Sequence, residues 1–386
     1  MTSPHRGFTD EEFHNRLARA QRAMDQAGLD ALLLTTHPDI YYFTGYLTRF
    51  WESPTRPWFL LVPASGLPVA VIPSIGAQLM AATWITDIRT WSAPDLEDDG
   101  ISLLADTITE VVGKGRIGLP SGHETHVRMP LADFDNLKGL LPHVAMDADA
   151  GIVRALRMVK SDAEIAKITQ ACRIAERSFA RMHEIAREGV TLDEVFRRFQ
   201  ILCLEEGADY VPYLAGGAGP DGYRDVITPA TPTPLTTGDV FMLDTGLVWD
   251  GYFCDFDRNF SIGAPAEHIA AAGHQLLEAT QAGFEAARPG KRACDVFQAM
   301  NQVLSSKTAP ADSGRLGHGL GIQLTEWPSL MAADETVLQP GMVLTLEPVA
   351  PTRNCCMLVH EENIVVTETG GHYLTHSNRL PEVVGG

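Results

Sequence analysis

Five side chains that can bind a divalent metal are spread over the second half of the chain, each in or beside an apolar segment typical of a β-strand. They are Asp244, Asp255, His318, Glu347 and Glu361. Carboxylates with one imidazole suit Mn, Co, Fe or Zn, and two such ions need several carboxylates to balance their charge. The fold must therefore bring distant strands together. If the five side chains converge, the sequence predicts a dinuclear metal hydrolase.

The first two candidates lie on the arms of a predicted β-hairpin. An apolar strand that starts at Val240 ends on Asp244, and Asp255 follows the turn Trp249-Asp250-Gly251. Side chains on neighbouring antiparallel strands are close enough to share one ion. We therefore expect an aspartate on each arm to face the same site.

The other three candidates belong to later segments. His318 stands between Gly317 and Gly319, and glycine lets the backbone approach a crowded centre closely. Glu347 follows one apolar strand and Glu361 precedes another. A single buried carboxylate is as often a helix cap or an ion-pair partner as a ligand. Five such groups together would be costly to bury without a cation.

Size and charge narrow the classes of protein that this chain can be. A length of 386 residues exceeds one average hydrophobic core, so two domains are expected. The net charge of −19 argues against a nucleic acid or an anionic membrane as partner, because both are bound by clustered lysine and arginine.

Targeting and redox features point to the cytoplasm. The amino-terminal segment has no apolar region typical of a signal peptide, and no apolar run approaches the length of a membrane span. The six cysteines lack zinc-type spacing, and the adjacent pair Cys355 and Cys356 does not suggest a disulfide framework. We expect free thiols in a reducing compartment.

Residues 1–155 alternate between helix and strand patterns. An amphipathic helix is predicted from Thr9 to Ala27, with three acidic residues in its first turn. Apolar strands are predicted at Asp30, Trp58 and Pro68. This alternation predicts an α/β amino-terminal domain.

Residues 156–386 begin with helices and continue with strands and turns. Capping boxes are predicted at Ser161–Glu164 and Thr191–Glu194, each opening a helix. From Tyr210 the pattern becomes strand and turn, interrupted by two helical stretches around residues 267–287 and 293–306. This order predicts an α+β second domain.

With these motifs the chain resembles the group of aminopeptidase P, prolidase and creatinase, peptidase family M24. The resemblance covers nearly the whole chain, including Asp39-Ile-Tyr-Tyr-Phe-Thr-Gly45 and Arg157-Met-Val-Lys-Ser161. It implies a creatinase-like amino-terminal domain over residues 1–155 and a catalytic domain with the pita-bread fold over residues 156–386. It also implies a homodimer.

The resemblance implies a role for each candidate. The family's five ligands are Asp, Asp, His, Glu and Glu in that order, which match Asp244, Asp255, His318, Glu347 and Glu361. Asp255 and Glu361 would be shared by two divalent ions, with Mn expected before Co, Fe or Zn. Glu347 is the expected catalytic residue, which carries a proton to the leaving nitrogen.

Three positions depart from the proline-specific peptidases. The glycine-rich segment 215–227 contains no histidine, Thr325 stands where the family has a second histidine, and Val359 stands where it has an arginine. These changes remove proton-handling groups and leave the metal ligands intact. We therefore expect a hydrolase of a C–N bond in a small substrate, similar to an Xaa-Pro dipeptidase. Amidohydrolases of the creatinase or ectoine hydrolase type and a metal-dependent lyase are the alternatives, and the lyase is disfavoured because Thr325 is no base at neutral pH.

Further residues have open roles. Asp257 lies two residues after Asp255 and on the same strand face, so it is either an extra ligand or outer partner, or a residue paired with Arg258 or solvent. Tyr223, Arg224 and Asp225 either bind substrate or are plain loop residues. The loop from Trp51 to Trp58, with Arg56, either reaches the partner subunit's site, as in the family, or packs in the core.

Overall fold

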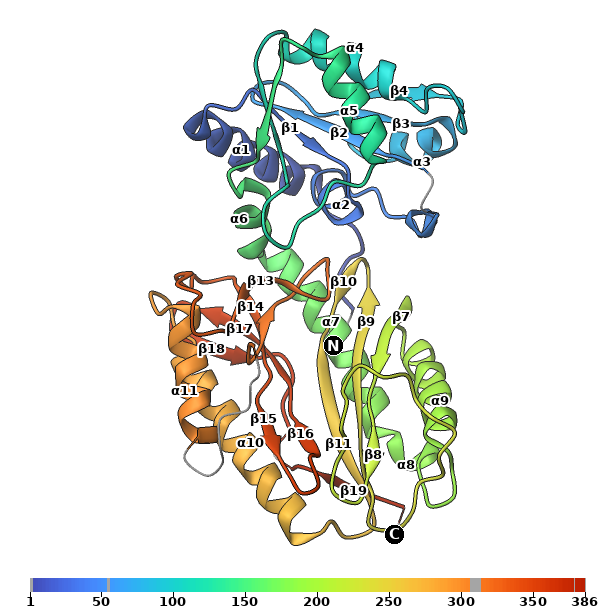
Figure 1. The fold of residues 1–386 in the computed structure, drawn as a ribbon, viewed down its shortest axis with the longest axis vertical. Helices are drawn as coiled ribbons and strands as arrows, with labels where there is room; N and C mark the ends of the chain where they lie inside the picture. Colours follow the sequence, from blue (N-terminus) through green and yellow to red (C-terminus); the bar gives the residue numbers. More distant parts are fainter. Residues whose placement is uncertain (1–2, 54–55, 306–313, 378, 386) are drawn as a thin grey trace. The chain divides into compact units, whose positions relative to one another are not determined.

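The structure is a computed structural model, and it describes residues 3–53, 56–305, 314–377 and 379–385. The chain divides into two compact units, one that spans His5–Arg157 and one that begins at Met158 (Figure 1). The expected division after residue 155 falls inside helix α6 (Ile152–Met158).

The unit His5–Arg157 is built on one six-stranded sheet with the order β4-β3-β2-β1-β5-β6. Strands β1–β2 and β2–β3 pair antiparallel, and the other neighbours are parallel. All residues of β1, β2 and β3 are buried, which confirms the three strands expected from their apolar runs. The strands are β1 (Ala31–Leu34), β2 (Phe59–Pro63), β3 (Val69–Pro73), β4 (Asp87–Trp91), β5 (Arg116–Leu119) and β6 (Ala145–Ala148).

Helices complete this α/β unit. The expected amphipathic helix is confirmed: α1 begins after Thr9, whose hydroxyl accepts the Glu12 N–H at 3.4 Å, and it ends at Gly28 in the left-handed conformation. The elements are α1 (Asp10–Ala27), α2 (His37–Thr44), η1 (Phe50–Glu52), η2 (Ser74–Gly76), α3 (Ala77–Ala81), α4 (Ile101–Val112), α5 (Leu131–Leu140) and α6.

The second unit holds two larger sheets and one small ribbon. The first sheet has the order β10-β9-β11-β19, and β7 and β8 also pair with β9. The second sheet has the order β13-β12-β14-β17-β18. The small ribbon consists of β15 paired with β16. The strands of the first sheet are β7 (Tyr210–Ala215), β8 (Ala218–Gly219), β9 (Val240–Trp249), β10 (Tyr252–Phe253), β11 (Phe256–Ile262) and β19 (Glu382–Val384). The others are β12 (His318–Gly319), β13 (Glu326–Ser329), β14 (Val343–Leu346), β15 (Val349–Pro351), β16 (Met357–Val359), β17 (Glu362–Thr367) and β18 (Gly370–Tyr373).

Each large sheet of this unit has its own helices. Helix α7 packs against β9 and β10 and α9 packs against β7, whereas α10 packs against β14 and β18 (Figure 1). A hydrophobic core joins α10 and α11 to the second sheet through residues such as Leu276, Val296 and Leu344. The helices are α7 (Asp162–Ala180), α8 (Met182–Ile185), α9 (Leu192–Glu205), α10 (Glu267–Ala286) and α11 (Ala293–Ser305).

The two predicted capping boxes differ in outcome. At α7 the Ser161 hydroxyl accepts the Glu164 N–H at 3.3 Å, and the Glu164 carboxylate accepts the Ser161 N–H at 2.9 Å, so this box is confirmed. At α9 the box is wrong, although Thr191 does occupy the N-cap. Its hydroxyl donates to the carboxylate of Asp193 instead, a local competitor for the same hydrogen bond.

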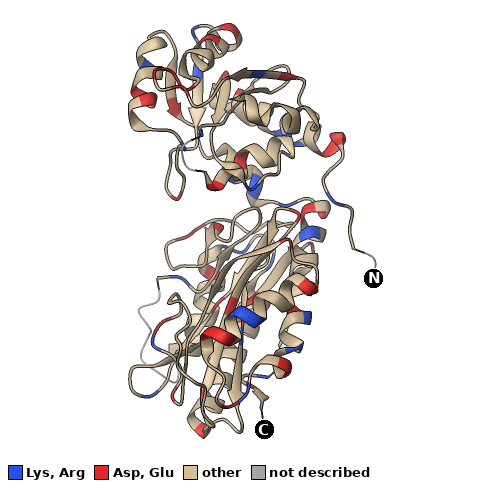
Figure 2. Ribbon diagram, turned by 90° about the vertical axis from the view of Figure 1, so that its right-hand side faces the viewer, with Lys and Arg blue, Asp and Glu red and all other residues tan. Residues whose placement is uncertain are grey.

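Charged residues of both signs are distributed over the ribbon. Figure 2 shows basic and acidic residues interspersed on the helices of each unit. Within the described ranges, no helix is both long enough and apolar enough to cross a membrane.

Candidate metal centre

Asp244 and Asp255 lie on neighbouring strands of the first sheet. Asp244 is in β9, Asp255 immediately precedes β11, and the connecting turn has positive φ at Asp250 (50°) and Gly251 (79°), as a type I′ hairpin turn requires. The predicted hairpin is confirmed. The residue opposite Asp244 is Asp257, and Asp255 lies two positions earlier on the same face.

The remaining candidates come from the second sheet. His318 is in β12, Glu347 follows β14 and Glu361 precedes β17. Leu346 of β14 pairs with Glu362 of β17, so the same register continued by one residue sets Glu347 opposite Glu361. The two antiparallel strands therefore deliver two carboxylates to the same edge.

Two glycines allow His318 its position. A Cβ on Gly317 would lie 2.3 Å from the carbonyl oxygen of Thr345, and a Cβ on Gly319 would lie 2.3 Å from that of Trp327. Neither distance is tolerable for a side chain, and Gly317 also has a φ of +132°. The close backbone approach expected from the Gly-His-Gly sequence is present.

Three of the five candidates converge tightly. Single ligand atoms of Asp255, His318 and Glu361 all lie within 4.8 Å of one another, and His318 Nε2 is 3.4 Å from Asp255 Oδ2. All three residues are buried, with exposures of 3%, 4% and 2%. Asp244 and Glu347 do not belong to this tight group but act on it through their charges.

Burial of so many carboxylates is unfavourable. Burial first, and then neighbouring carboxylates, raises the pKa of Asp244, Asp255 and Glu361 well above the ordinary range. The same two causes, with Asp257 as the neighbour, raise the pKa of Glu347 to about 7. A cation among these groups would offset the repulsion. Consistent with such a fit, Asp244 Oδ1 and Glu361 Oε1 are buried and find no hydrogen-bond partner among the described residues.

The state of His318 also fits a metal ligand. Burial first, then the charge of Arg315, lowers its pKa to about 4, so the ring is neutral at physiological pH. Nδ1 lies 2.8 Å from the carbonyl oxygen of Gly319, which can only accept, so Nδ1 carries the proton. The lone pair is then on Nε2, the atom that faces Asp255.

Two residues near the centre escaped sequence analysis. The pKa of the Tyr213 phenol is raised by burial and then by the charges of Asp244 and Asp255, which places this β7 tyrosine beside the centre. Arg315 is close enough for its charge to lower the pKa of Asp255 and Glu347. The sequence offered one signal for each residue. Arg315 stands three residues before His318, and Tyr213 is an aromatic residue in a strand that pairs with β9.

Some residues in the segments that depart from the peptidase pattern have structural roles. Tyr223 is only 2% exposed; its hydroxyl accepts the Val359 N–H at 2.7 Å and donates to Asn259 Oδ1 at 3.0 Å. Tyr223 is therefore a core residue, whereas Arg224 and Asp225 are exposed. Next to the partly buried Thr325, Glu326 is held by Lys160 at 3.0 Å.

The loop around Trp51 is fixed by Arg128. The guanidinium of Arg128 donates to the carbonyl oxygens of Arg56 (2.5 Å) and Ser53 (2.7 Å) and lies 5.2 Å from the centre of the Trp51 ring. Trp58 is 1% exposed and belongs to the core, which is one of the two roles expected for the tryptophans of this loop. Trp51 is only partly buried.

A network of buried charges stands next to the candidate ligands. His360 Nδ1 lies 3.9 Å from Asp257 Oδ1, and its Nε2 lies 3.3 Å from Glu362 Oε1. Burial would lower the pKa of His360, but Asp257 and Glu362 outweigh it and raise the pKa to about 9. Burial would raise the pKa of Glu362, but Arg258 and then His360 lower it to about 2.

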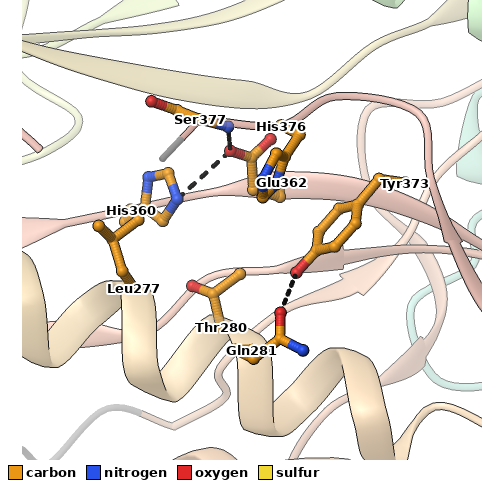
Figure 3. Close-up of a pocket in the computed structure, with 8 residues that line it drawn as sticks. All are labelled: Leu277, Thr280, Gln281, His360, Glu362, Tyr373, His376 and Ser377. Carbon is orange, nitrogen blue, oxygen red and sulfur yellow. Dashed lines mark hydrogen bonds and ion pairs between the residues drawn. The ribbon is translucent and has the colours of Figure 1, made fainter. Parts of the chain in front are cut away.

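This network borders a cavity of about 190 Å³ between α10 and the second sheet. In Figure 3, the imidazole of His360 and the Ser377 backbone both point at Glu362, and Tyr373 reaches Gln281 on α10. His360 and Glu362 are thus held on both sides by other parts of the fold.

Comparisons with known proteins agree with this architecture. Residues 166–368 match metallopeptidase family M24, and residues 16–159 match the creatinase/prolidase N-terminal domain. A probable dipeptidase PepE from Mycobacterium bovis is 32% identical over 377 residues, which cover 95% of each chain. An Xaa-Pro dipeptidase from Pyrococcus horikoshii is 25% identical, over 92% of this chain and 95% of that protein.

Solved structures show the same fold. The crystal structure of dipeptidase PepE from Mycobacterium ulcerans has a TM-score of 0.85 at 28% identity and covers 98% of this chain and 100% of its own. A prolidase from Thermococcus sibiricus has a TM-score of 0.86 at 23% identity, over 96% and 99% of the two chains. The chain therefore belongs to metallopeptidase family M24, as a metallohydrolase of the dipeptidase and aminopeptidase type with a creatinase-type N-terminal domain and a pita-bread catalytic domain.

Proposed function

We propose that this chain is a dipeptidase whose catalytic domain, residues 156–386, holds two divalent ions. Their ligands would be Asp244, Asp255, His318, Glu347 and Glu361. The observation that carries this proposal is the convergence of Asp255, His318 and Glu361 within 4.8 Å, deep in the unit. The partnerless oxygens on Asp244 and Glu361 support it, because a buried anionic oxygen without a donor needs a cation.

The proposed native metal is Mn. Four carboxylates and one imidazole form a ligand set dominated by hard oxygens, which suits Mn, although Co, Fe and Zn accept the same donors. When bound, the ions would activate a water molecule and polarise the carbonyl group of the substrate. The metal present after purification, and the metal that gives the highest activity in refilled protein, test this choice.

Each ligand residue has a proposed role at the centre. His318 keeps its proton on Nδ1 through the Gly319 carbonyl, so Nε2 stays available. Glu347 is less enclosed than Asp255 or Glu361, which suits the proposed transfer of a proton to the leaving nitrogen. Asp255 and Glu361, both buried, would help to hold the ions.

Dipeptides are the proposed substrate class, because the relatives most similar in sequence include proteins described as dipeptidases. The departures at Thr325, Val359 and the glycine-rich segment lie outside the ligand set. We therefore expect hydrolysis to persist and the preference for proline to be relaxed.

A panel of small substrates tests this function. Mn-loaded protein is incubated with Xaa-Pro dipeptides, other dipeptides, creatine, an ectoine-type cyclic amidine and a sulfonium compound, and products are separated by chromatography. Free amino acids from dipeptides would support the proposal. Turnover confined to the amidines would replace it with an amidohydrolase, and an alkene released from the sulfonium compound would replace it with a lyase.

We also propose a homodimer in which the loop from Trp51 to Trp58 contributes to the partner subunit's site. The partly buried ring of Trp51, held by Arg128, supports a presented aromatic surface. A dimer in sedimentation analysis, and a raised KM with unchanged metal content in Trp51→Ala, are expected. A monomer that is fully active would exclude this arrangement.

The proposed location is the cytoplasm. All six cysteines are free, with Cys172, Cys203, Cys254 and Cys294 buried. Unpaired thiols suit a reducing compartment. Cell fractionation of a tagged chain, with the tag recovered among cytoplasmic proteins, is the expected result.

A further inference from the structure

We propose that Asp257 is a positioning residue of the metal centre: it places a further negative charge opposite Asp244 and is held there by Asn259 and His360. The inference rests on the metal centre proposed above. It assigns a role to a carboxylate outside the five expected ligands.

The register of the first sheet brings the two aspartates face to face. Asp257 of β11 pairs directly with Asp244 of β9, and directly opposed side chains in an antiparallel pair have Cβ atoms about 4.5–5.5 Å apart. Asp244 is 9% exposed and Asp257 is 1% exposed. Two like charges in this arrangement destabilise a sheet, and burial increases the repulsion.

The charge of the neighbouring Arg258 acts on Asp257, but the hydrogen bonds of its guanidinium go to other atoms. The guanidinium of Arg258 donates to the backbone oxygens of Asp257 and Glu361 and to the carboxylate of Glu362. Asp244 Oδ1 and Asp257 Oδ2 are left without hydrogen-bond partners in the part of the chain that the structure describes. His360 offsets part of the charge of Asp257, and a cation in the proposed centre would offset the charge of Asp244.

The other oxygen of Asp257 is anchored. Asn259 Nδ2 donates to Asp257 Oδ1 at 3.2 Å, and His360 Nδ1 lies 3.9 Å from the same atom. His360 is fully buried and is held in turn through Glu362 (Figure 3). Glu362 is fixed by Arg258 at 3.1 Å, by the Thr375 hydroxyl at 2.5 Å and by the Ser377 N–H at 2.6 Å.

This division between the two oxygens indicates an outer role rather than direct coordination. The tight group of ligand atoms comprises Asp255, His318 and Glu361 and does not include Asp257. The charge of Asp257 nevertheless acts on Asp244 and Glu347, which belong to different sheets. Asp257 thus strengthens cation binding through its charge, and substitution of such outer partners typically weakens metal affinity about 10- to 100-fold.

The experiment uses Asp257→Asn, which keeps the shape and removes the charge. Mn(II) binding to chelator-treated protein is measured by calorimetry, and the melting temperature is recorded with and without Mn(II). We expect Mn(II) to bind at least about 10-fold more weakly. We also expect Mn(II) to raise the melting temperature of the variant by less than it raises that of wild type. A merely structural Asp257 would instead lower the melting temperature in both states and leave the Mn(II) dissociation constant unchanged, which would overturn the inference.

Two further variants keep the test decisive. Asn259→Ala removes the neutral amide anchor and leaves the charge of Asp257 in place, so weaker Mn(II) binding supports the inference even if Asp257→Asn fails to fold; unchanged binding would overturn the anchoring role. Tyr373→Phe, on the wall of the same cavity, is the matched control and should bind Mn(II) as wild type does. If wild type itself binds no Mn(II), the proposed function fails; if wild type binds Mn(II) and both variants bind it equally well, only this inference fails.

Discussion

At the scale of single residues, the centre is defined by groups whose burial is unfavourable one by one. Asp255 and Glu361 are almost fully enclosed, and neighbouring carboxylates raise the pKa of both. Such a cluster is retained in a fold when a cation, and not a donor side chain, balances it. His318, neutral and with Nε2 available, supplies the nitrogen donor.

Asp255→Ala is the first prediction at this scale. It removes a member of the tight three-residue group, so we expect both ions to be lost and turnover to fall below detection. Elemental analysis and a dipeptide assay on the same sample measure the two effects. Retention of full metal and activity would show that Asp255 is not a ligand. Asp106→Ala, an exposed aspartate of α4, is the control.

Thr325→His concerns the lost peptidase histidine. The family resemblance implies that a histidine at this position lies near the scissile bond. An imidazole there can act as a general acid or base, so we expect kcat for an Xaa-Pro dipeptide to rise by up to about tenfold, a small part of the usual contribution of such a group. Metal content should not change. If kcat stays at the wild-type value, the histidine missing from the glycine-rich segment is the limiting one.

His37 gives a prediction for pH. Burial, and then the charge of Arg157, lowers its pKa to about 4, below the value of about 6.5 in an unfolded chain. Between these values the unfolded state binds more protons, so stability is lost as pH falls from about 6.5 to 4, by at most about 3 kcal/mol. His37→Gln should flatten this part of the profile. Urea unfolding at several pH values measures it, and parallel profiles for both proteins would contradict the assignment.

At the scale of elements, local sequence signals predicted helices, strands and turns, but they did not predict how the strands pair. The helix α1, the strands β1 to β3 and the hairpin turn at Asp250-Gly251 follow from caps, apolar runs and turn residues, which act within a few positions. The register of β9 against β11 does not, because it depends on packing of the whole sheet. The observed register sets Asp257 opposite Asp244.

Long-range pairing also limits how much of the candidate site can be predicted from the sequence. The five residues were predicted from the sequence by their type and by the family resemblance. The neighbours Tyr213 and Arg315, and the link from Asp257 to His360, join segments that only the fold brings together. The pattern also predicted a capping box at Thr191. The Thr191 hydroxyl donates a hydrogen bond to the carboxylate of Asp193 instead.

The two N-caps supply a matched prediction. Ser161→Ala removes a hydroxyl that accepts the Glu164 N–H, so we expect a loss of about 1 kcal/mol in the free energy of unfolding. Thr191→Ala removes a hydroxyl that makes no cap bond and should have a smaller effect. Urea denaturation compares the two. Equal losses would show that the Ser161 cap does not contribute as its geometry indicates.

At the scale of the whole molecule, the centre joins two sheets of one unit. Asp244 and Asp255 come from the first sheet, and His318, Glu347 and Glu361 come from the second. Bound ions would therefore tie the sheets together and stabilise the folded state in proportion to their binding. Chelation should lower the melting temperature of the protein, and added Mn(II) should restore it.

The most direct test is the metal content of the chain, measured by elemental analysis of protein purified without chelator or nickel affinity resin and then refilled with Mn(II). The dinuclear centre predicts about two ions per chain. A value near zero, with no uptake of Mn(II) or Fe(II), would contradict it and would mean that the five side chains do not form a metal site.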